Sequence, residues 1–249
     1  VSREYSAVVP VATQEQARIL GRIGAIMAHD HGGDVLALHV VQVPPQLTLG
    51  EGRLMLKEGR TYLETVIQQA KALDVPVHTL LRLGRNVADA VRKTVEENAS
   101  DLIVLGWPGY TNTAGRLFGS VIDPIVDNPP TDIAIIRYRM YRPLRSILVP
   151  VAAGPNSRRA VKIAVSMARS GEHQPVAVRL IHVVPPGAGQ VGQLRAEQIF
   201  THVMEGIEFD SVDKYAVEGS DIANTILRYA QGPSLEDAYD LIVIGATNE

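Results

Sequence analysis

The sequence predicts an α/β protein built from two tandem, doubly wound parallel sheets, and three observations support this fold class. Short apolar runs alternate with segments whose apolar residues recur at helical spacing. The whole pattern occurs twice along the chain. A glycine-punctuated loop follows the fourth apolar run, at the edge where such folds bind ligands. Strands that alternate with helices form right-handed crossovers, so both faces of each sheet are covered.

Five runs in the first half are interpreted as buried parallel strands because they are apolar almost throughout. They are residues 7–11, 35–43, 75–83, 102–105 and 132–136. Helices are expected between them, where apolar residues recur every three or four positions. These residues are Ala17, Leu20, Ile23 and Met27, then Leu63, Val66, Ile67 and Ala70, then Val87, Val91 and Val95. A short helix is expected over residues 121–126, opened by Ser120.

The second half repeats this plan with losses. Strands are expected at residues 147–151, 178–184 and 241–244, and helices near 160–168, 194–203 and 222–227. No second glycine loop, fourth helix or fifth strand follows before Glu249, so the second copy is interpreted as truncated. Because the sequence also lacks a starting Met, we expect it to be a piece of a longer protein.

Four ordered matches establish the duplication. The matched pairs are Pro10 and Pro150, His39 and His182, Gly84 and Gly219, and Gly106 and Gly245. The separations lie near ~140 residues, far above the period of solenoid or propeller units. We therefore expect two domains, residues 1–140 and 141–249. They would pair with each other as an intramolecular pseudo-dimer, or with a second chain as a homodimer.

Composition limits the function classes. The chain has 249 residues and a net charge of −3, which gives no general attraction for nucleic acid or anionic lipid. The absence of cysteine excludes disulfides, thiol nucleophiles and thiolate metal sites. No apolar run approaches the ~20 residues of a membrane helix. We expect a soluble, cytoplasmic piece with no nucleic-acid partner.

The loop after the fourth strand carries the strongest chemical signal. Two residues separate Gly106 from Gly109, nine more precede Gly119, and Ser120 follows. Glycines let a backbone approach an anion closely, and the first N–H groups of a helix point towards it. The loop therefore predicts a phosphate site, with ordinary turn punctuation as the alternative. No lysine follows Gly119, so the loop indicates binding rather than phosphoryl transfer.

The spacing G-x2-G-x9-G-[ST] resembles the nucleotide-binding signature of the universal stress protein family, and the likeness spans nearly the whole chain as two copies. The resemblance implies a five-stranded parallel sheet in the order 3-2-1-4-5. Some members of the family bind ATP or AMP and others bind no nucleotide, so the resemblance implies either an adenine nucleotide as the ligand or none. The residues themselves indicate no metal site. Gly106, Gly109, Gly119 and Ser120 would contact phosphates and ribose. Val40 would meet the adenine through its backbone.

Other residues at the same edge complete or weaken this expectation. Arg116, inside the loop, is either an anion ligand or an ordinary exposed residue. Ala12 follows the first strand, and we expect it to be part of the site. ATP-binding members of the family usually carry an aspartate at this position. The missing charge-assisted hydrogen bond is worth about 1.5–3 kcal/mol, or roughly ten- to hundredfold in affinity. Trp107 either stacks on a base or fills a gap.

The opening at residues 9–12 and the segment 153–157 resemble a particular branch, the tandem copies at the cytosolic tails of amino-acid permeases and cation–proton antiporters. The resemblance implies an attached transmembrane transporter domain and a regulatory role at the cytosolic face of the cell membrane. The alternative is a stand-alone tandem protein that serves as a dimerisation scaffold without nucleotide. We expect no enzymatic activity, because no nucleophile–base set, carboxylate pair or metal triad stands out.

Three further patterns have structural interpretations. His29 and His31, beside a glycine stop, indicate a helix C-terminus rather than a metal site. His39 and His182 recur at equivalent strand positions, which favours core histidines bonded to neighbouring backbone over catalytic ones. The basic and aromatic segment 137–145 is interpreted as a linker or domain interface rather than a nucleic-acid surface.

Overall fold

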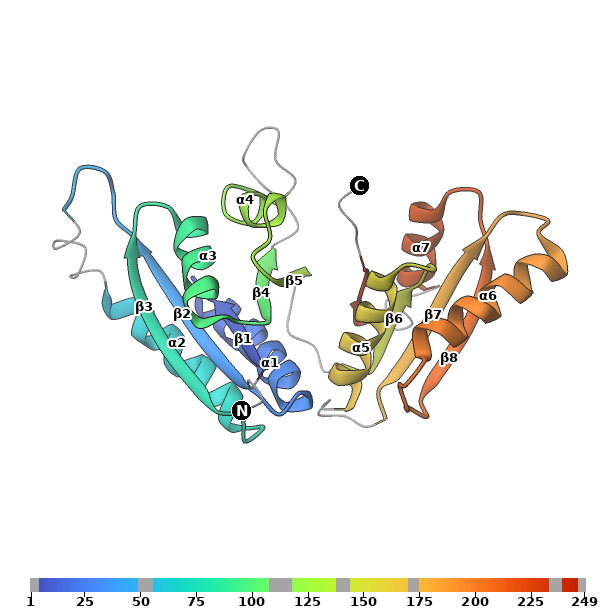
Figure 1. The fold of residues 1–249 in the computed structure, drawn as a ribbon, viewed down its shortest axis with the longest axis horizontal. Coiled ribbons are helices and arrows are strands. Elements are labelled where there is room, and N and C mark those ends of the chain that lie inside the picture. The colour runs from blue at the N-terminus through green and yellow to red at the C-terminus, as the bar shows by residue number, and fades with distance from the viewer. Residues whose placement is uncertain are drawn as a thin grey trace. The chain divides into compact units, whose positions relative to one another are not determined.

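The computed structural model describes residues 5–48, 56–107, 118–137, 144–169, 175–232 and 239–245. The chain divides into two compact units, Val1–Tyr141 and Arg142–Glu249. Each unit contains one parallel sheet with helices packed on it (Figure 1). The fold class expected from the sequence is confirmed, and the second sheet is the smaller of the two.

The sheet of the first unit has five strands in the order β3-β2-β1-β4-β5, as the family resemblance implies. The chain winds outwards from β1 to β3 and then crosses to the other side of β1 to form β4 and β5. The elements are β1 (Ser6–Pro10), α1 (Gln14–Asp30), β2 (Asp34–Gln42), α2 (Leu56–Lys71), β3 (Val77–Gly84), α3 (Val87–Asn98), β4 (Leu102–Trp107), α4 (Ile122–Asp127) and β5 (Asp132–Arg137).

Alternate side chains of these strands meet helices on opposite faces of the sheet, because the side-chain period of a strand is two. On one face, Val9 lies against α1 and His39 lies against α2. On the other face, Leu38 and Ile103 belong to a buried apolar cluster completed by α3 and α4. The buried members that the two helices supply are Ala88, Val91, Val95, Ile122 and Ile125.

The second unit has a four-stranded parallel sheet in the order β8-β7-β6-β9. The sequence pattern did not locate β8, and β9 is shorter than the expected strand 241–244. Helix α6 also begins five residues before the expected start near residue 194. The elements are β6 (Ser146–Pro150), α5 (Pro155–Arg169), β7 (Ala177–Val184), α6 (Gly189–Met204), β8 (Val212–Glu218), α7 (Ile222–Gln231) and β9 (Leu241–Ile242).

The face of the second sheet that α7 covers has a smaller apolar cluster than its counterpart in the first unit. Its buried members are Leu148, Ile181 and Ala230. Beside them, Arg179 of β7 donates to the Tyr239 hydroxyl at 3.1 Å and lies 5.6 Å from the centre of that ring. The hydrogen bond to Tyr239 raises the pKa of Arg179. Arg179, which lies opposite Leu148 in the ladder, thus takes the place that Leu36 has opposite Val8 in the first unit.

The predicted end of the first helix is confirmed. Helix α1 ends at Asp30, and His31 forms its C-cap. The Nδ1 atom of His31 lies 2.8 Å from the Met27 carbonyl oxygen, and its ring stacks on Tyr5. Gly32 then turns the chain with a φ of 63°. The histidine therefore satisfies a helix carbonyl.

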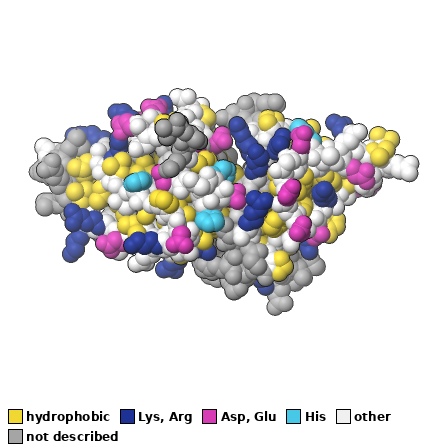
Figure 2. All heavy atoms as spheres, turned by 60° about the horizontal axis from the view of Figure 1, so that its bottom comes forward, with side chains coloured by type: hydrophobic (Ala, Val, Ile, Leu, Met, Phe, Trp, Pro, Cys, Tyr) yellow, Lys and Arg dark blue, Asp and Glu magenta, His cyan; other side chains and the backbone are white. Residues whose placement is uncertain are grey.

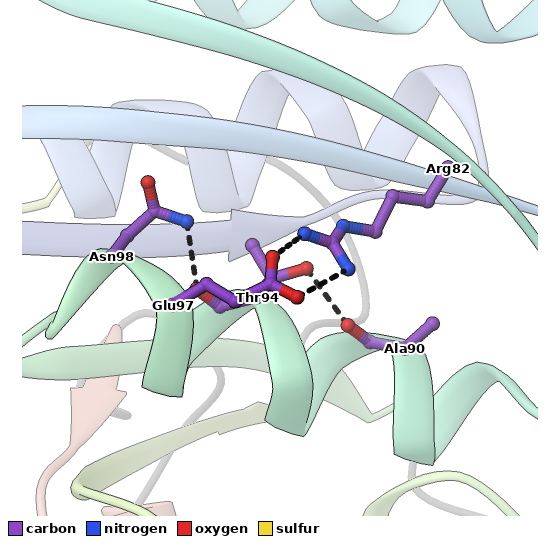
Figure 3. Close-up of polar contacts among 5 residues, drawn as sticks. All are labelled: Arg82, Ala90, Thr94, Glu97 and Asn98. Carbon is purple, nitrogen blue, oxygen red and sulfur yellow. Dashed lines mark hydrogen bonds and ion pairs between the residues drawn. The ribbon is translucent and has the colours of Figure 1, made fainter.

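Helix α3 is tied to the edge strand β3 by an exposed ion pair (Figure 3). Arg82 of β3 donates to both carboxylate oxygens of Glu97, and this bond lowers the pKa of Glu97. Thr94 and Asn98 instead donate to carbonyls of their own helix, each at 2.8 Å. The ion pair is thus the polar link between the helix and the strand in this view.

Acidic and basic side chains are interspersed over the face drawn in Figure 2. This agrees with the net charge of −3 and gives that face no field of a single sign. Within the described ranges, none of the helices combines the length and the apolar character needed to cross a membrane.

Gly59 of α2 is expected to resist substitution. A Cβ atom at this position would lie 2.3 Å from Cδ2 of His39 and 2.7 Å from Cδ2 of Leu81. Such overpacking costs about 1–3 kcal/mol, against roughly 1 kcal/mol that alanine gains over glycine in a helix. Gly59→Ala should therefore lower the urea midpoint of unfolding. In Gly84→Ala, whose nearest contact would be 3.6 Å away, the midpoint should hardly change.

The Arg82–Glu97 pair gives a pH-dependent prediction. Because the folded-state pKa of Glu97 is lowered, its stabilisation is fully present above 4.5, the ordinary value, and is lost as the pH falls through the lowered pKa. Glu97→Gln should lower the urea midpoint at neutral pH, and the difference from wild type should vanish in acid. Glu96→Gln, on the same exposed helix surface, is the matched control. Equal midpoint changes in both variants at every pH would contradict the prediction.

Candidate functional site

The central strand β1 ends before its neighbours do, and this leaves a gap at the carboxyl edge of the first sheet. Strand β1 pairs with β2 as far as Pro10 and Leu38, while β2 continues to Gln42. On its other side, the β1–β4 pairs end at Val8 and Ile103, while β4 continues along β5 to Trp107. The strand order reverses here, which is where open α/β sheets bind ligands.

Three predicted site residues belong to the segments that border this gap. Continuing the observed registers places Ala12 beside Val40 of β2 and Val11 beside Gly106 of β4. Ala12 is exposed, and Val40 and Gly106 are half-buried. The order of the strands thus places these segments along the same edge of the sheet, and their role in ligand binding stays a prediction.

Pro10 explains why the β1–β4 ladder stops. The Asp101 N–H donates to the Ser6 carbonyl at 2.8 Å, so every second residue from Ser6 directs its backbone towards β4. Pro10 is on that side and has no N–H to donate. The second copy ends in the same way, because the Val243 N–H donates to Leu148 at 2.9 Å and Pro150 follows.

Val40 presents free backbone groups to the gap. The hydrogen bonds of β2 alternate, since Leu38 accepts from Val11 at 2.8 Å on one side and Val35 donates to Pro76 at 2.9 Å on the other. Val40 therefore points its N–H and C=O towards β1, beyond the end of that strand. Neither group has a partner on that side among the described residues. An adjacent donor and acceptor of this kind can pair with the rim of a planar heterocycle.

Trp107 extends β4 rather than opening the loop, because its backbone pairs with Arg137 of β5. Its ring meets Phe118 edge-on at 5.2 Å, and the Arg137 guanidinium lies 5.6 Å from its centre. The ring is also packed against the apolar cluster of α3 and α4. These contacts favour the gap-filling interpretation of Trp107 over base stacking.

The helix after the loop begins later than predicted. Gly119 has a φ of 111°, a conformation that favours glycine, but Ser120 does not cap the helix. Val121 is the N-cap and makes no side-chain cap bond. Instead, Asp123 in the first turn accepts the Phe118 N–H at 2.9 Å. This carboxylate takes a loop donor and puts negative charge where the phosphate was expected.

Of the other predicted site residues, the structure describes Ala12 and leaves two undescribed. Gly109 and Arg116 lie outside the described residues. The Ala12 N–H donates to Oε1 of Gln16 at 2.9 Å, and the corresponding Ala152 N–H donates to Ser157 Oγ at 2.9 Å. In both copies, a side chain in the first turn of the following helix therefore fixes the backbone of the alanine. This alanine stands where ATP-binding members of the family usually carry an aspartate.

Close packing also requires a glycine after the last strand of the second copy. In the second copy, a Cβ atom on Gly245 would lie 2.1 Å from the Asn156 carbonyl oxygen. Gly245 therefore admits the backbone of the first turn of α5. Gly106 corresponds to it, so a glycine at this position has a use besides contact with phosphate.

A hollow of about 680 Å³ lies elsewhere, at the corner between β8 and α7. Its polar wall includes Glu218, Asp221 and Arg228. Asp221 caps α7 by accepting the Asn224 N–H at 3.0 Å, and this bond lowers the pKa of Asp221. Two carboxylates, one of them already the cap of the helix, and one guanidinium therefore line this hollow. In the described part of the chain, no three His, Asp or Glu side chains are grouped as metal ligands.

The universal stress protein family model matches residues 6–137. The chain belongs to the universal stress protein family. Its fold extends over both units, because the crystal structure of a universal stress protein from Archaeoglobus fulgidus DSM 4304 aligns with 99% of this chain and 88% of its own. That alignment has a TM-score of 0.65 at 17% identity.

Two further relatives match parts of this universal stress protein. An A. fulgidus universal stress protein in complex with dAMP aligns with 55% of the chain and all of its own, at 16% identity and a TM-score of 0.44. The Na(+)/H(+) antiporter NhaS5 of Synechocystis sp. PCC 6803 is 26% identical over 183 residues, which make up 73% of this chain. The chain spans only 26% of the length of that antiporter.

The backbone conformation at Gly119 gives a testable prediction. Because an L side chain is strained at a φ of 111°, Gly119→Ala should destabilise the first unit by about 1–3 kcal/mol. Ser120→Ala is the matched control, since Ser120 is exposed and forms no cap bond. Thermal unfolding of both variants would measure the difference. A melting temperature for Gly119→Ala equal to that of the control would refute the strain.

Proposed function

We propose that the chain is a regulatory module that binds an adenine nucleotide, AMP or ATP, and that it acts as part of a membrane transporter at the cytosolic face. The observation that carries the proposal is the gap at the carboxyl edge of the first sheet, where Val40 offers a free N–H and C=O. The glycine loop starts at the same edge from Gly106. One gap would therefore receive a base on the β2 side and phosphates on the β4 side.

Adenine suits the base side of this gap. The rim of adenine carries an amino donor next to a ring-nitrogen acceptor, and a strand offers an acceptor and a donor at matching positions. Guanine presents a carbonyl where adenine presents its amino group, so the same edge would discriminate against it.

The affinity should be modest. Ala12 supplies no carboxylate for the base or ribose, and Asp123 opposes the phosphate. Modest affinity suits a sensor, because occupancy then follows changes in nucleotide concentration. We propose binding without turnover. The ligand would act by favouring one arrangement of the module or its partner, to the extent that it binds that arrangement more tightly.

The antiporter relative supports the transporter attachment. The alignment, at 26% identity, covers most of this chain but only a quarter of the length of the antiporter. A module of this size joined to membrane-spanning segments would account for that coverage. The transported solute is either a cation or an amino acid.

A scaffold module is the second candidate, because several large apolar side chains of the second unit are exposed. Leu227 of α7 is 51% exposed and Ile222 is 63% exposed. On α6, Leu194 is 60% exposed and Val191 is 78% exposed. Exposed apolar side chains on α6 or on α7 would serve protein contacts without any nucleotide.

Calorimetry with AMP and ATP tests the function. Both should bind, GMP should bind more weakly, and Asp123→Asn should raise the affinity for AMP. Removing a unit charge near the phosphate is worth about 1 kcal/mol in a wet site, or roughly fivefold in affinity. Asparagine can still accept the Phe118 N–H, so the loop should keep its shape.

The matched control is Asp127→Asn, which removes the same charge from the exposed C-terminal end of α4. Its affinity for AMP should equal that of the wild type. If folded wild-type protein takes up neither AMP nor ATP, the scaffold function replaces the nucleotide function.

A further inference from the structure

A histidine closes the end of the central ladder in each copy. The Nδ1 atom of His39 lies 2.7 Å from the Val11 carbonyl oxygen, and that of His182 lies 2.8 Å from the Val151 carbonyl oxygen. A carbonyl oxygen only accepts, so each Nδ1 carries a proton and donates it. The prediction of a histidine bonded to neighbouring backbone is thus confirmed in both copies.

The carbonyl that each histidine captures is the acceptor that the next rung of the ladder would need. The preceding rung is present in both copies, as Val11 donates to Leu38 and Val151 donates to Ile181, each at 2.8 Å. The following rung of a parallel ladder would run from Val40 to Val11, or from Val183 to Val151. Neither bond is present among the described residues.

Val183 therefore repeats the arrangement of Val40. The Val178 N–H donates to Ser211 on the β8 side, and Val184 accepts from Gly219 on that side at 3.0 Å. Val183, between these alternating positions, directs its backbone towards β6, where Pro150 has ended the strand. Both valines are half-buried.

The ring of His39 is held in place from the opposite side. It is 9% exposed, lies edge-on to Tyr62 at 5.4 Å, and occupies the space that the absent side chain of Gly59 leaves. A ring fixed in this way keeps its proton aimed at Val11. Space filling alone would not require that hydrogen bond.

We propose that His39 and His182 are positioning residues that end the β1–β2 and β6–β7 ladders one rung early. By taking the Val11 and Val151 carbonyls, they keep the backbone of Val40 and Val183 open as a recognition edge. The second copy thus has an edge of its own at Val183. Its ligand class, a planar heterocycle with an adjacent donor and acceptor such as adenine, rests on the function proposed above.

Residue-resolved amide exchange by NMR on the whole chain tests this role without any ligand. In the wild type, the amides of Val40 and Val183 should exchange at least about tenfold faster than those of Val41 and Val184, which are bonded within the sheets. His39→Leu should slow the exchange of Val40 by about tenfold and create a scalar coupling across a new Val40–Val11 hydrogen bond. His182→Leu should do the same at Val183.

His39→Asn and His182→Asn are the matched controls. The amide of asparagine can donate from nearly the same place as Nδ1, so Val40 and Val183 should keep exchanging fast. Wild-type amides of Val40 and Val183 as protected as Val41 and Val184 would overturn the proposal, whether or not the leucine variants fold. So would a folded leucine variant in which neither exchange nor coupling changes.

Titration with AMP, followed at the same amides, tests the ligand class. Shifts at both Val40 and Val183 that the leucine variants lose and the asparagine variants keep would support the two edges. Shifts at Val40 alone would overturn the edge of the second copy. If AMP shifts neither amide while the exchange pattern is as expected, the positioning role stands and the proposed adenine-nucleotide function fails.

Discussion

The early end of the central strand is the constraint on which the site depends. A parallel sheet normally satisfies its backbone by continuing each ladder as far as the strands run, and buried N–H and C=O groups are rarely left unpaired. Here β1 stops at Pro10 while β2 continues to Gln42 and β4 to Trp107. Two kinds of residue enforce this end. Pro10 removes a donor on the β4 side, and His39 occupies an acceptor on the β2 side.

Both devices recur in the second copy, at Pro150 and His182. They are also among the residues whose repetition first revealed the duplication. The repeated local sequences therefore encode the carboxyl edge of the sheet as well as its core. Unlike a catalytic side chain, an edge that recognises its ligand through the main chain, as proposed, would tolerate divergence of the side chains around it. The fold itself persists at 17% identity in the A. fulgidus relative.

The sequence predicted most of the fold, because the buried strands are continuous apolar runs and the helices carry clear apolar stripes. It failed at β8, whose seven residues are largely exposed along one edge of the sheet and give no buried run. It also placed Trp107 in the loop, since the pairing of Trp107 with Arg137 of β5 is a long-range contact that local pattern cannot reveal. Helix α4 starts at Ile122 with Val121 as its N-cap, whereas Ser120 was expected to open it. Here the competing contact is local, because the Asp123 carboxylate in the first turn accepts the Phe118 N–H.

The two copies share the base side of the site and differ on the phosphate side, and this separates two contributions to binding. The open edge at Val40 has its counterpart at Val183, whereas Gly119 and the α4 carboxylate of Asp123 follow only the first sheet in the described chain. A ligand that binds through its base alone should not distinguish the copies strongly. Under the proposed function, a phosphorylated ligand would meet the glycine at position 119 and the opposing carboxylate of Asp123 in the first copy, and its preference between the copies would depend on which of the two dominates. The charge of Asp123 would then decide whether the phosphate adds to the affinity of the base or subtracts from it.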